Sequence, residues 1–292
     1  MFSKIIFRLL FICFYLLSLL PFWIIYLLSD FLFFILYYLV GYRRKVVFQN
    51  LKNAFPQKSE AEINIIAKKF FRYLCDFIFE IIKINSMTEK DFFKRCTISP
   101  EAEKLFSDLY AQNKKMIFVM GHFGNFEWGG HSFSLLKKHK LYVIYHPLSN
   151  KIFGKLIYKI RSRFGTTPVT THDMVRNMID KRNEMNVTAF IADQTPAPEN
   201  AYWTHFLNQD TPIFTGTEKI ARKFNYPLIF INIKRIKRGY YTIEAELFPK
   251  NPSDTFEGEI SEWHTRKLEA EIIQQPEIWL WSHRRWKHKR LA

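Results

Sequence analysis

Apolar residues are distributed unevenly along the chain, and the longest apolar stretch lies at its beginning. Residues 5–42 are almost entirely apolar, with Pro21 and Asp30 among the few interruptions. The uncharged run from Leu9 to Ser29 has about the length needed for a transmembrane helix. It is too long for a cleavable signal peptide, and no small-residue cleavage site follows it. We therefore expect residues 1–42 to form a hydrophobic membrane anchor, as a single crossing, as a hairpin around Pro21, or with a second helix at the interface.

After this segment, helix-like and strand-like patterns alternate, which predicts one α/β domain over residues 43–292. Ser59 and Glu62 form a capping-box pattern before a long amphipathic helix that runs to about Ile84. The other periodic runs are 46–56, 117–120, 141–145, 151–164, 174–181, 187–192, 213–224, 228–233 and 240–247. We expect a mixed central sheet flanked by helices, with functional groups where strands end.

The most informative stretch is MIFVMGHFGNFEWGG, in which a short buried strand ends at a glycine and His122 follows. Glu127 comes five residues later, and residues five apart on a regular helix lie about 140° from one another. The two side chains can meet if His122 lies on the turn after the strand and Glu127 lies in the first turn of the next helix. An ionised Glu127 bonded to one imidazole nitrogen would leave the other nitrogen free as a general base.

The turn between these two residues has a distinctive composition. Gly121 and Gly124 allow unusual backbone angles, and Asn125 is a suitable N-cap for a helix that continues over 131–138. The helix dipole would favour the ionised form of Glu127. A histidine with a glutamate five residues on is also common by chance, and such pairs are often structural. The glycine-rich turn favours catalysis over that alternative.

Charge and cysteine content restrict the partners and the compartment. The chain has 43 Lys and Arg against 27 Asp and Glu, a net charge of +16. An excess of this size indicates an anionic partner, which could be a nucleic acid, an anionic membrane, an acidic protein or a phosphorylated substrate. Cys13, Cys75 and Cys96 form no metal-binding or disulfide pattern, so we expect a reducing compartment and no metal or cofactor. The cations at 43–45 directly after the apolar segment place the remainder in the cytosol.

Three further candidate sites follow predicted elements. Arg161 and Arg163 end a helical run, where they could hold phosphates or a developing oxyanion, or simply complement the helix dipole. Asp193 and Gln194 follow an apolar strand; the aspartate could orient an arginine or bind a sugar hydroxyl, although a turn-forming Asp is the commoner case. Residues 214–217 could receive an anion at a helix N-terminus or act only as a cap.

The chain ends in a segment of interleaved aromatic and basic residues, 279–290. Such a segment could stack on single-stranded nucleic acid. It also suits a membrane interface, where Trp lies at headgroup depth and Arg and Lys contact phosphates. Because an apolar segment precedes the domain, we expect the membrane role and no nucleic-acid binding.

Taken in order, these motifs resemble the late acyltransferases of bacterial lipid A biosynthesis, of lauroyl and myristoyl type. This family belongs to the H-x4-D/E glycerolipid acyltransferase superfamily, whose motif matches Gly-His-Phe-Gly-Asn-Phe-Glu at 121–127. Other matching pieces extend over nearly the whole chain: 50–51, 54–56, 145–147, 161–163, 193–194, 214–216 and 281–286. The resemblance implies transfer of a fatty acyl chain from acyl carrier protein to a hydroxyl of a lipid A precursor, at the cytosolic side of the bacterial inner membrane.

The resemblance also implies roles for individual residues. His122 and Glu127 match the catalytic pair, and Arg161 and Asp193 match residues of the same pocket. The sequence departs from the family at His146, where an Arg is usual, and at 171–172, where a strongly basic residue is less clear. The full set of expected substrate-binding residues is Arg161, Asp193, Arg163, Gln194 and Asn125.

Two alternatives remain on the sequence alone. The same chemistry could serve another glycolipid or an aminolipid acceptor. A non-enzymatic, membrane-tethered protein with a basic surface could instead bind anionic polymers, and salt-sensitive nucleic-acid binding would favour that alternative. No G-x-S-x-G or comparable nucleophile motif is present, so we expect direct transfer without an acyl-enzyme.

Overall fold

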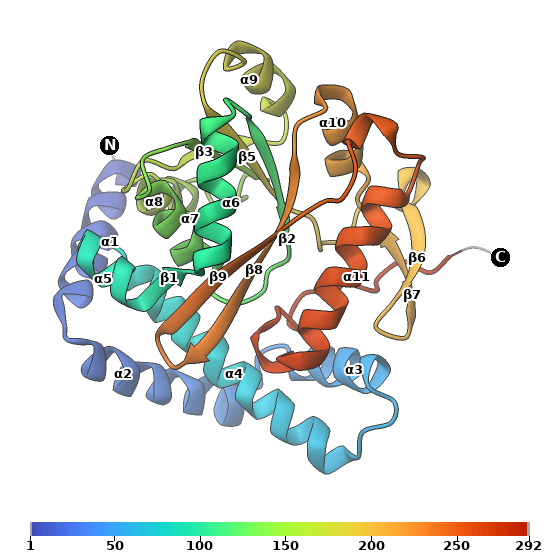
Figure 1. Cartoon of the computed structure of the whole chain (residues 1–292). Helices are drawn as coiled ribbons and strands as arrows, with labels where there is room; N and C mark the ends of the chain where they lie inside the picture. The colour runs from blue at the N-terminus through green and yellow to red at the C-terminus, as the bar shows by residue number, and fades with distance from the viewer. Residues whose placement is uncertain (1, 291–292) are drawn as a thin grey trace.

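A seven-stranded sheet forms the centre of the protein (Figure 1), whose computed structural model describes residues 2–290. Residues 1, 291 and 292, which belong to the expected segments 1–42 and 43–292, lie outside the described residues. The strand order is β1-β9-β8-β2-β5-β3-β4, and only β8 and β9 pair in antiparallel fashion. The strands are β1 (Cys96–Ile98), β2 (Met116–Met120), β3 (Lys140–Tyr145), β4 (Thr167–Thr170), β5 (Asn186–Ile191), β8 (Leu228–Lys237) and β9 (Tyr240–Leu247). The predicted mixed α/β fold is confirmed.

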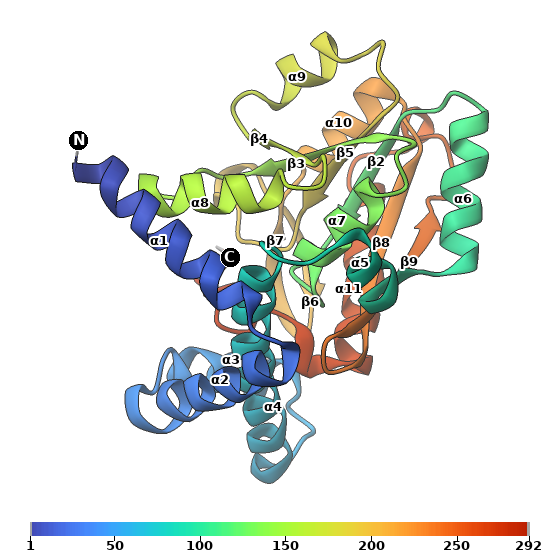
Figure 2. The same cartoon turned by 90° about the vertical axis from the view of Figure 1, so that its left-hand side faces the viewer.

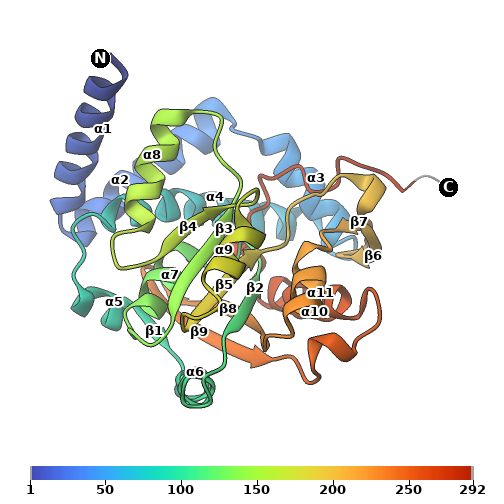
Figure 3. The same cartoon turned by 90° about the horizontal axis from the view of Figure 1, so that it is seen from above.

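Both faces of the sheet are covered, because its central strands are apolar on both sides. In β2, Ile117 and Val119 belong to one core, whereas Met116 and Phe118 belong to the other. The core around Phe118 is covered by α5 (Glu89–Arg95), α6 (Pro100–Ala111), α7 (Phe126–Ser134) and α8 (Lys151–Arg161). The opposite core involves α3 (Arg44–Ala54), α4 (Glu60–Lys83), α10 (Gly216–Phe224) and α11 (Glu259–Gln274). Figure 3 shows α5, α6 and α7 on one side of the strands and α10 and α11 on the other.

Most predicted elements are present, with shifted ends. The capping box of Ser59 and Glu62 is formed at the start of α4. The helix expected from the Asn125 cap through 131–138 begins at Phe126 but ends at Ser134, and the backbone of Lys137 is left-handed with φ +56°. The run 213–224 contains the end of β7 followed by α10. The polar hairpin of β6 (Tyr202–Phe206) and β7 (Gln209–Ile213), the short strands β1 and β4, and helices α5 and α6 were not predicted.

The apolar N-terminal segment forms two helices that meet at Pro21. They are α1 (Phe2–Leu19) and α2 (Phe22–Phe34), and α2 continues as a π-helical segment, Ile35–Val40. Among the described residues, Phe22–Val40 is the one helix long and apolar enough to cross a membrane, and Ile5–Leu19 is shorter. Both helices pack on α4, and α1 also contacts α8 (Figure 2).

The C-terminal aromatic residues belong to the protein core. Trp279 is 2 % exposed and Trp281 is fully buried, and Arg285 is 1 % exposed. The Trp286 indole donates to Thr211 Oγ1 at 2.7 Å. The expectation that these residues serve the membrane interface is therefore wrong, because their aromatic surface is already covered by the protein.

Candidate active site

The ends of two neighbouring parallel strands bring His122 and Asp193 together. In the register of β2 and β5, Met120 lies beside Ile191. His122 and Asp193 each follow two residues after that pair, so both stand at the carboxyl edge of the sheet. This edge is where parallel sheets place their functional groups.

The imidazole of His122 is held by the buried carboxylate of Asp193. His122 Nδ1 lies 2.6 Å from Asp193 Oδ1, and the backbone N–H of His122 donates to Oδ2 at 2.8 Å. The indole N–H of Trp279 donates to the same Oδ2 at 2.8 Å. Burial alone would raise the pKa of Asp193, but these partners lower it to about 2. An ionised Asp193 accepts a hydrogen bond from the Nδ1–H group, which keeps the proton on Nδ1 and leaves Nε2 unprotonated and available as a base.

Glu127 lies in the first turn of α7, as expected, but its carboxylate does not bond to His122. Its carboxylate accepts hydrogen bonds from Arg161. Arg161 Nε lies 3.0 Å from both carboxylate oxygens, and Arg161 Nη2 lies 2.5 Å from Glu127 Oε1. Burial opposes the charge on Glu127, but Arg161 lowers the pKa of this carboxyl. The expected hydrogen bond between Glu127 and His122 is therefore corrected: Asp193 orients the imidazole, and Glu127 holds the arginine. The carboxylate prefers Arg161 because a guanidinium offers two parallel donors.

Glycine conformation and a hydrogen bond from α4 fix the turn that carries His122. Gly124 has φ +60°, and a Cβ there would lie 1.9 Å from Ile233 O, so only glycine fits. At Gly121 a Cβ would lie 2.7 Å from the terminal methyl groups of Leu268, which would have to shift to make room for it. The hydroxyl of Tyr73 donates to Gly124 O at 2.6 Å. The turn is thus fixed by backbone conformation and by a buried hydrogen bond.

Asn125 connects this turn to a second buried acid. Its Oδ1 accepts from Trp128 N at 2.9 Å, which confirms the predicted N-cap of α7. Its Nδ2 donates to Glu80 Oε2 at 2.7 Å, and Tyr241 OH donates to the same oxygen at 2.8 Å. Burial, together with repulsion from Asp76, raises the pKa of Glu80. Because both polar ends of the fully buried Asn125 are occupied within the protein, its geometry is that of a positioning residue and not of a substrate ligand.

Of the remaining residues considered in the sequence analysis, some line the cleft that contains His122 and one lies outside it. Gln194 and His146 line the same cleft as His122. Arg163 does not reach it: this side chain donates to the carbonyl of Ile84 and lies over the ring of Phe164. The structure therefore brings Arg161, Asp193 and Gln194 to the site and leaves Arg163 outside.

A cleft and a deeper apolar cavity meet at the Glu127–Arg161 ion pair. The cleft contains His122 and measures about 670 Å³, taken as the space open to the centre of a water-sized sphere. The inner cavity measures about 50 Å³ in the same terms and lies between the sheet and α6 and α7. Both spaces are lined by Glu127, Arg161, Phe126, Val143 and Ile191. The deep walls are almost wholly apolar: Phe106, Phe118, Phe133, Leu141, Ile231 and Ile243.

Three supporting residues escaped the sequence analysis. Trp279 stood in the segment assigned to the membrane interface, and its position after a proline-containing turn gave no indication that it contacts Asp193. Tyr73 and Glu80 lie on an amphipathic helix, where their spacing is that of any core residue. Within residues 2–290, no group of three or more His, Cys, Asp or Glu side chains is arranged to hold a metal ion.

Comparison with known proteins adds a family to this geometry. The family model for bacterial lipid A biosynthesis acyltransferases matches residues 1–288. The lipid A biosynthesis lauroyltransferase of Escherichia coli K12 is 24 % identical over 248 residues, covering 84 % of this chain and 79 % of that protein. The palmitoleoyltransferase of the same organism and a lipid A biosynthesis acyltransferase of Shigella flexneri are each 23 % identical over 251 residues, with the same coverage.

Proposed function

Because the chain belongs to the bacterial lipid A biosynthesis acyltransferases, and is therefore an enzyme of acyl transfer in lipid A biosynthesis, we propose that it moves a fatty acyl chain from acyl carrier protein to a hydroxyl of a lipid A precursor. The observation that carries the proposal is the His122–Asp193 hydrogen bond of 2.6 Å in a cleft that adjoins an apolar cavity. A base so placed suits deprotonation of an alcohol brought by a substrate.

His122 Nε2 takes the proton of the acceptor hydroxyl as its oxygen attacks the thioester carbonyl. The carbon–oxygen bond forms, the tetrahedral intermediate collapses, and the carbon–sulfur bond breaks. The proton held by His122 then passes to the leaving thiolate, which regenerates the base. Asp193 stabilises the transient imidazolium, as a buried carboxylate does in other histidine-based sites.

The acyl chain of the donor occupies the inner cavity, with its thioester at the junction beside Arg161. Nε and Nη2 of Arg161 are engaged by Glu127, which fixes the plane of the guanidinium. Nη1 has no protein acceptor among the described residues and is free to stabilise the oxyanion. Glu127 acts through Arg161 in this scheme and is a positioning residue.

We expect Glu127→Gln to lower both turnover and stability. The substitution leaves the buried Arg161 charge without its partner, which typically costs about 3 kcal/mol. Binding of the acyl donor should persist, since the apolar cavity is unchanged. Thermal denaturation in detergent and acyl transfer by the purified protein measure the two effects.

The double variant Glu127→Gln/Arg161→Gln is the control. The double variant also removes the positive charge of Arg161, which the single variant leaves unpaired, so part of the lost stability should return. A Glu127→Gln protein as stable and active as the wild type would refute the role of this ion pair.

A row of lysines on α8 offers a docking surface for an acidic donor protein. Lys151 and Lys155 are exposed on the helix whose Gly154 and Ile157 line the cleft. Acyl carrier protein is acidic, so cations beside the cleft would steer it toward the site.

Reversing these charges should weaken use of the protein-bound donor. For Lys151→Glu/Lys155→Glu we expect the KM for acyl carrier protein thioester to rise by about tenfold at low salt, with little change in kcat. High salt should reduce the difference. Lys104→Glu on α6, which lies on the far side of the molecule from α8 in Figure 2, is the matched control. An unchanged KM would show that the donor docks elsewhere.

The proposal places the protein at the inner membrane, with the catalytic domain on the cytosolic side. Support comes from the exposed apolar surface of α1 and α2 and from the cations Arg43, Arg44 and Lys45 that follow, which suit the anionic headgroups of the cytosolic leaflet.

The decisive experiment combines the purified protein with a lipid A precursor and either acyl carrier protein thioester or coenzyme A thioester. Mass spectrometry should show one added acyl chain with the first donor. Lipids of a deletion strain should lack the same chain. Addition to another glycolipid or aminolipid would identify a different acceptor, and no transfer to any lipid would overturn the proposal.

A further inference from the structure

Helix α2 lies alongside α4 over its whole length, in the opposite direction. Contacts between the two segments recur from end to end: Lys83 Nζ donates to Leu20 O at 2.8 Å, Ser29 Oγ to Asp76 Oδ1 at 2.7 Å, and the rings of Tyr37 and Phe71 lie 5.3 Å apart. α4 belongs to the core of the catalytic domain. If α2 crossed a bilayer end-on, α4 would have to enter the hydrocarbon with it.

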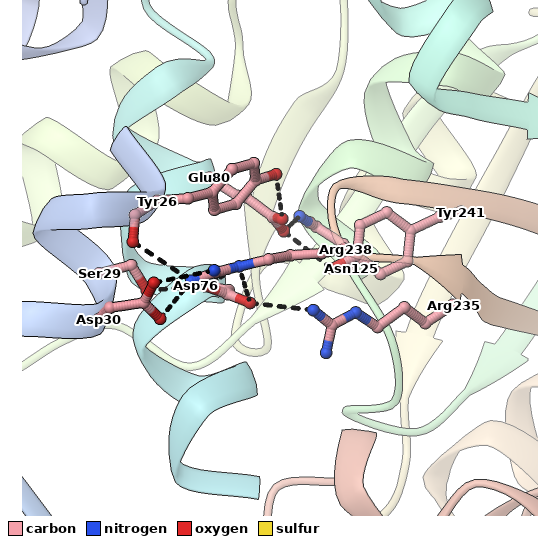
Figure 4. Close-up of polar contacts among 9 residues, drawn as sticks. All are labelled: Tyr26, Ser29, Asp30, Asp76, Glu80, Asn125, Arg235, Arg238 and Tyr241. Carbon is pink, nitrogen blue, oxygen red and sulfur yellow. Dashed lines mark hydrogen bonds and ion pairs between the residues drawn. The ribbon is translucent and has the colours of Figure 1, made fainter. Parts of the chain in front are cut away.

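Charged groups are fixed to α2 near the middle of its apolar segment (Figure 4). Asp30 lies one residue from Phe31, the midpoint of Phe22–Val40. Arg238 on the β8–β9 turn bonds to Asp30 at 2.8 Å and to the buried Asp76 at 2.6 Å, and Arg235 bonds to Asp76 at 2.9 Å. A perpendicular α2 would place this cluster at the depth where charges are least tolerated.

The same network reaches the catalytic turn. Tyr26 of α2 donates to Glu80 at 3.0 Å, and Glu80 accepts from Asn125, the N-cap of α7 (Figure 4). Because α2 and the turn that carries His122 are joined through one buried carboxylate, the orientation of α2 also sets the orientation of the site.

The sides of α1 and α2 that face away from the protein are apolar, and the apolar surface is continuous along each helix. In Figures 1 and 3 the two helices form a V along one edge of the molecule, with the sheet on one side of it. Residues three or four apart are exposed on both helices, as on an interfacial helix. The most exposed are Leu9 at 58 %, Leu16 at 59 %, Trp23 at 65 %, Leu27 at 59 % and Phe31 at 63 %.

Cations border this apolar surface. A groove of about 730 Å³, measured as above, lies between α2 and α4. Its lining includes the aromatic residues Phe33, Phe34 and Tyr38, the cations Lys69 and Arg72, the paired charges Asp30, Asp76, Arg235 and Arg238, and Glu277. The Arg72 guanidinium lies 5.0 Å from the centre of the Phe33 ring. Lys69 and Arg72 are exposed and have no carboxylate partner within residues 2–290. Aromatic rings beside such cations match the boundary between acyl chains and anionic headgroups.

We propose that α1 and α2 lie in the plane of one leaflet of an anionic membrane and do not cross it. This inference rests on the proposed membrane association and replaces the transmembrane crossing expected from the sequence. The apolar stripes enter the acyl region, and Lys69 and Arg72 contact lipid phosphates. The catalytic domain then rests on the leaflet that supplies the acceptor.

Spin labels along the exposed stripe of α2 test this orientation. Labels are attached to single cysteines at Trp23, Leu27, Phe31 and Phe34 in a Cys13→Ser background, because Cys13 is exposed whereas the other two cysteines are buried. Immersion depth is measured by electron paramagnetic resonance in vesicles of phosphatidylethanolamine and phosphatidylglycerol. An in-plane helix gives nearly equal depths at the four positions. A perpendicular helix gives depths at Trp23 and Phe31 that differ by about 12 Å, from the rise of 1.5 Å per residue.

A depth profile that peaks at Phe31 and falls toward both ends overturns the in-plane orientation but leaves the proposed enzyme activity intact. Labels that all remain in water overturn it as well, together with the membrane association. A label at Phe256, 69 % exposed and distant in sequence from both helices, should remain accessible to water in every case. Acyl transfer is measured in the same samples. Equal depths without any transfer would count against the proposed function and not against the orientation.

Discussion

Replacing His122 with alanine should reduce acyl transfer by at least about 10²–10⁴-fold, the contribution of a general base. Neither neighbouring carboxylate can replace the imidazole, since Asp193 is buried behind the ring and Glu127 is bonded to Arg161. The protein should remain folded and bound to membranes, because the imidazole is partly exposed and, within residues 2–290, Asp193 is its one hydrogen-bond partner. Single-turnover transfer with a radiolabelled acyl donor measures the loss.

His172→Ala is the matched control for that experiment. His172 is a histidine whose side chain is 95 % exposed and which lies outside the lining of the cleft. Its replacement should leave transfer unchanged. If His122→Ala retained near-full activity with the same fold, the assignment of His122 as the base would be refuted.

Asp193→Asn should be about as damaging as loss of the histidine, with a fall of up to about 10⁴-fold in turnover. The carboxylate accepts three hydrogen bonds, from His122 Nδ1, His122 N and Trp279 Nε1. If the amide oxygen keeps the backbone and indole donors, the amide nitrogen faces Nδ1 and donates to it. The proton of the imidazole then moves to Nε2, where the base is required, so the ring is held in the wrong tautomer.

The apparent melting temperature and donor affinity should accompany this measurement, because Asp193 is buried. Asp173→Asn, at a carboxylate whose side chain is 59 % exposed, supplies the control. A folded Asp193→Asn variant with normal turnover would show that the imidazole needs no carboxylate partner, and the mechanism would then lack its central contact.

The sequence was sufficient for the elements whose physical signals are local. The strand before His122, the capping of α7 by Asn125 and the capping box of α4 all follow from short-range pattern, and each is present. The orientation of His122 depends instead on which strands are neighbours. Spacing along the chain favoured Glu127 as its partner, whereas the pairing of β2 with β5 brings Asp193 closer. The sequence did contain one indication of this contact. His122 and Asp193 each stand just after a predicted strand, so they would meet if those two strands were parallel neighbours.

The misassigned C-terminal segment has a similar explanation. Tryptophan and arginine serve membrane interfaces and buried polar networks equally well, so composition does not separate the two. Trp279 and Trp281 are buried because the chain returns across the carboxyl edge of the sheet after α11, where Phe123 forms an isolated bridge with Trp279. Whether these tryptophans are buried or exposed to a membrane depends on the tertiary path of the chain, which the local sequence does not reveal.

The separation of His122 and Asp193 by 71 positions also affects how the enzyme comes into being. Contacts between distant parts of a chain form late, since a long loop must close before they are made. A nascent chain that has emerged only as far as α7 already exposes its apolar helices and includes His122, but it has no aspartate to orient the histidine. Unfinished molecules can therefore reach lipid while still unable to consume thioesters, and acquisition of turnover marks the completion of folding.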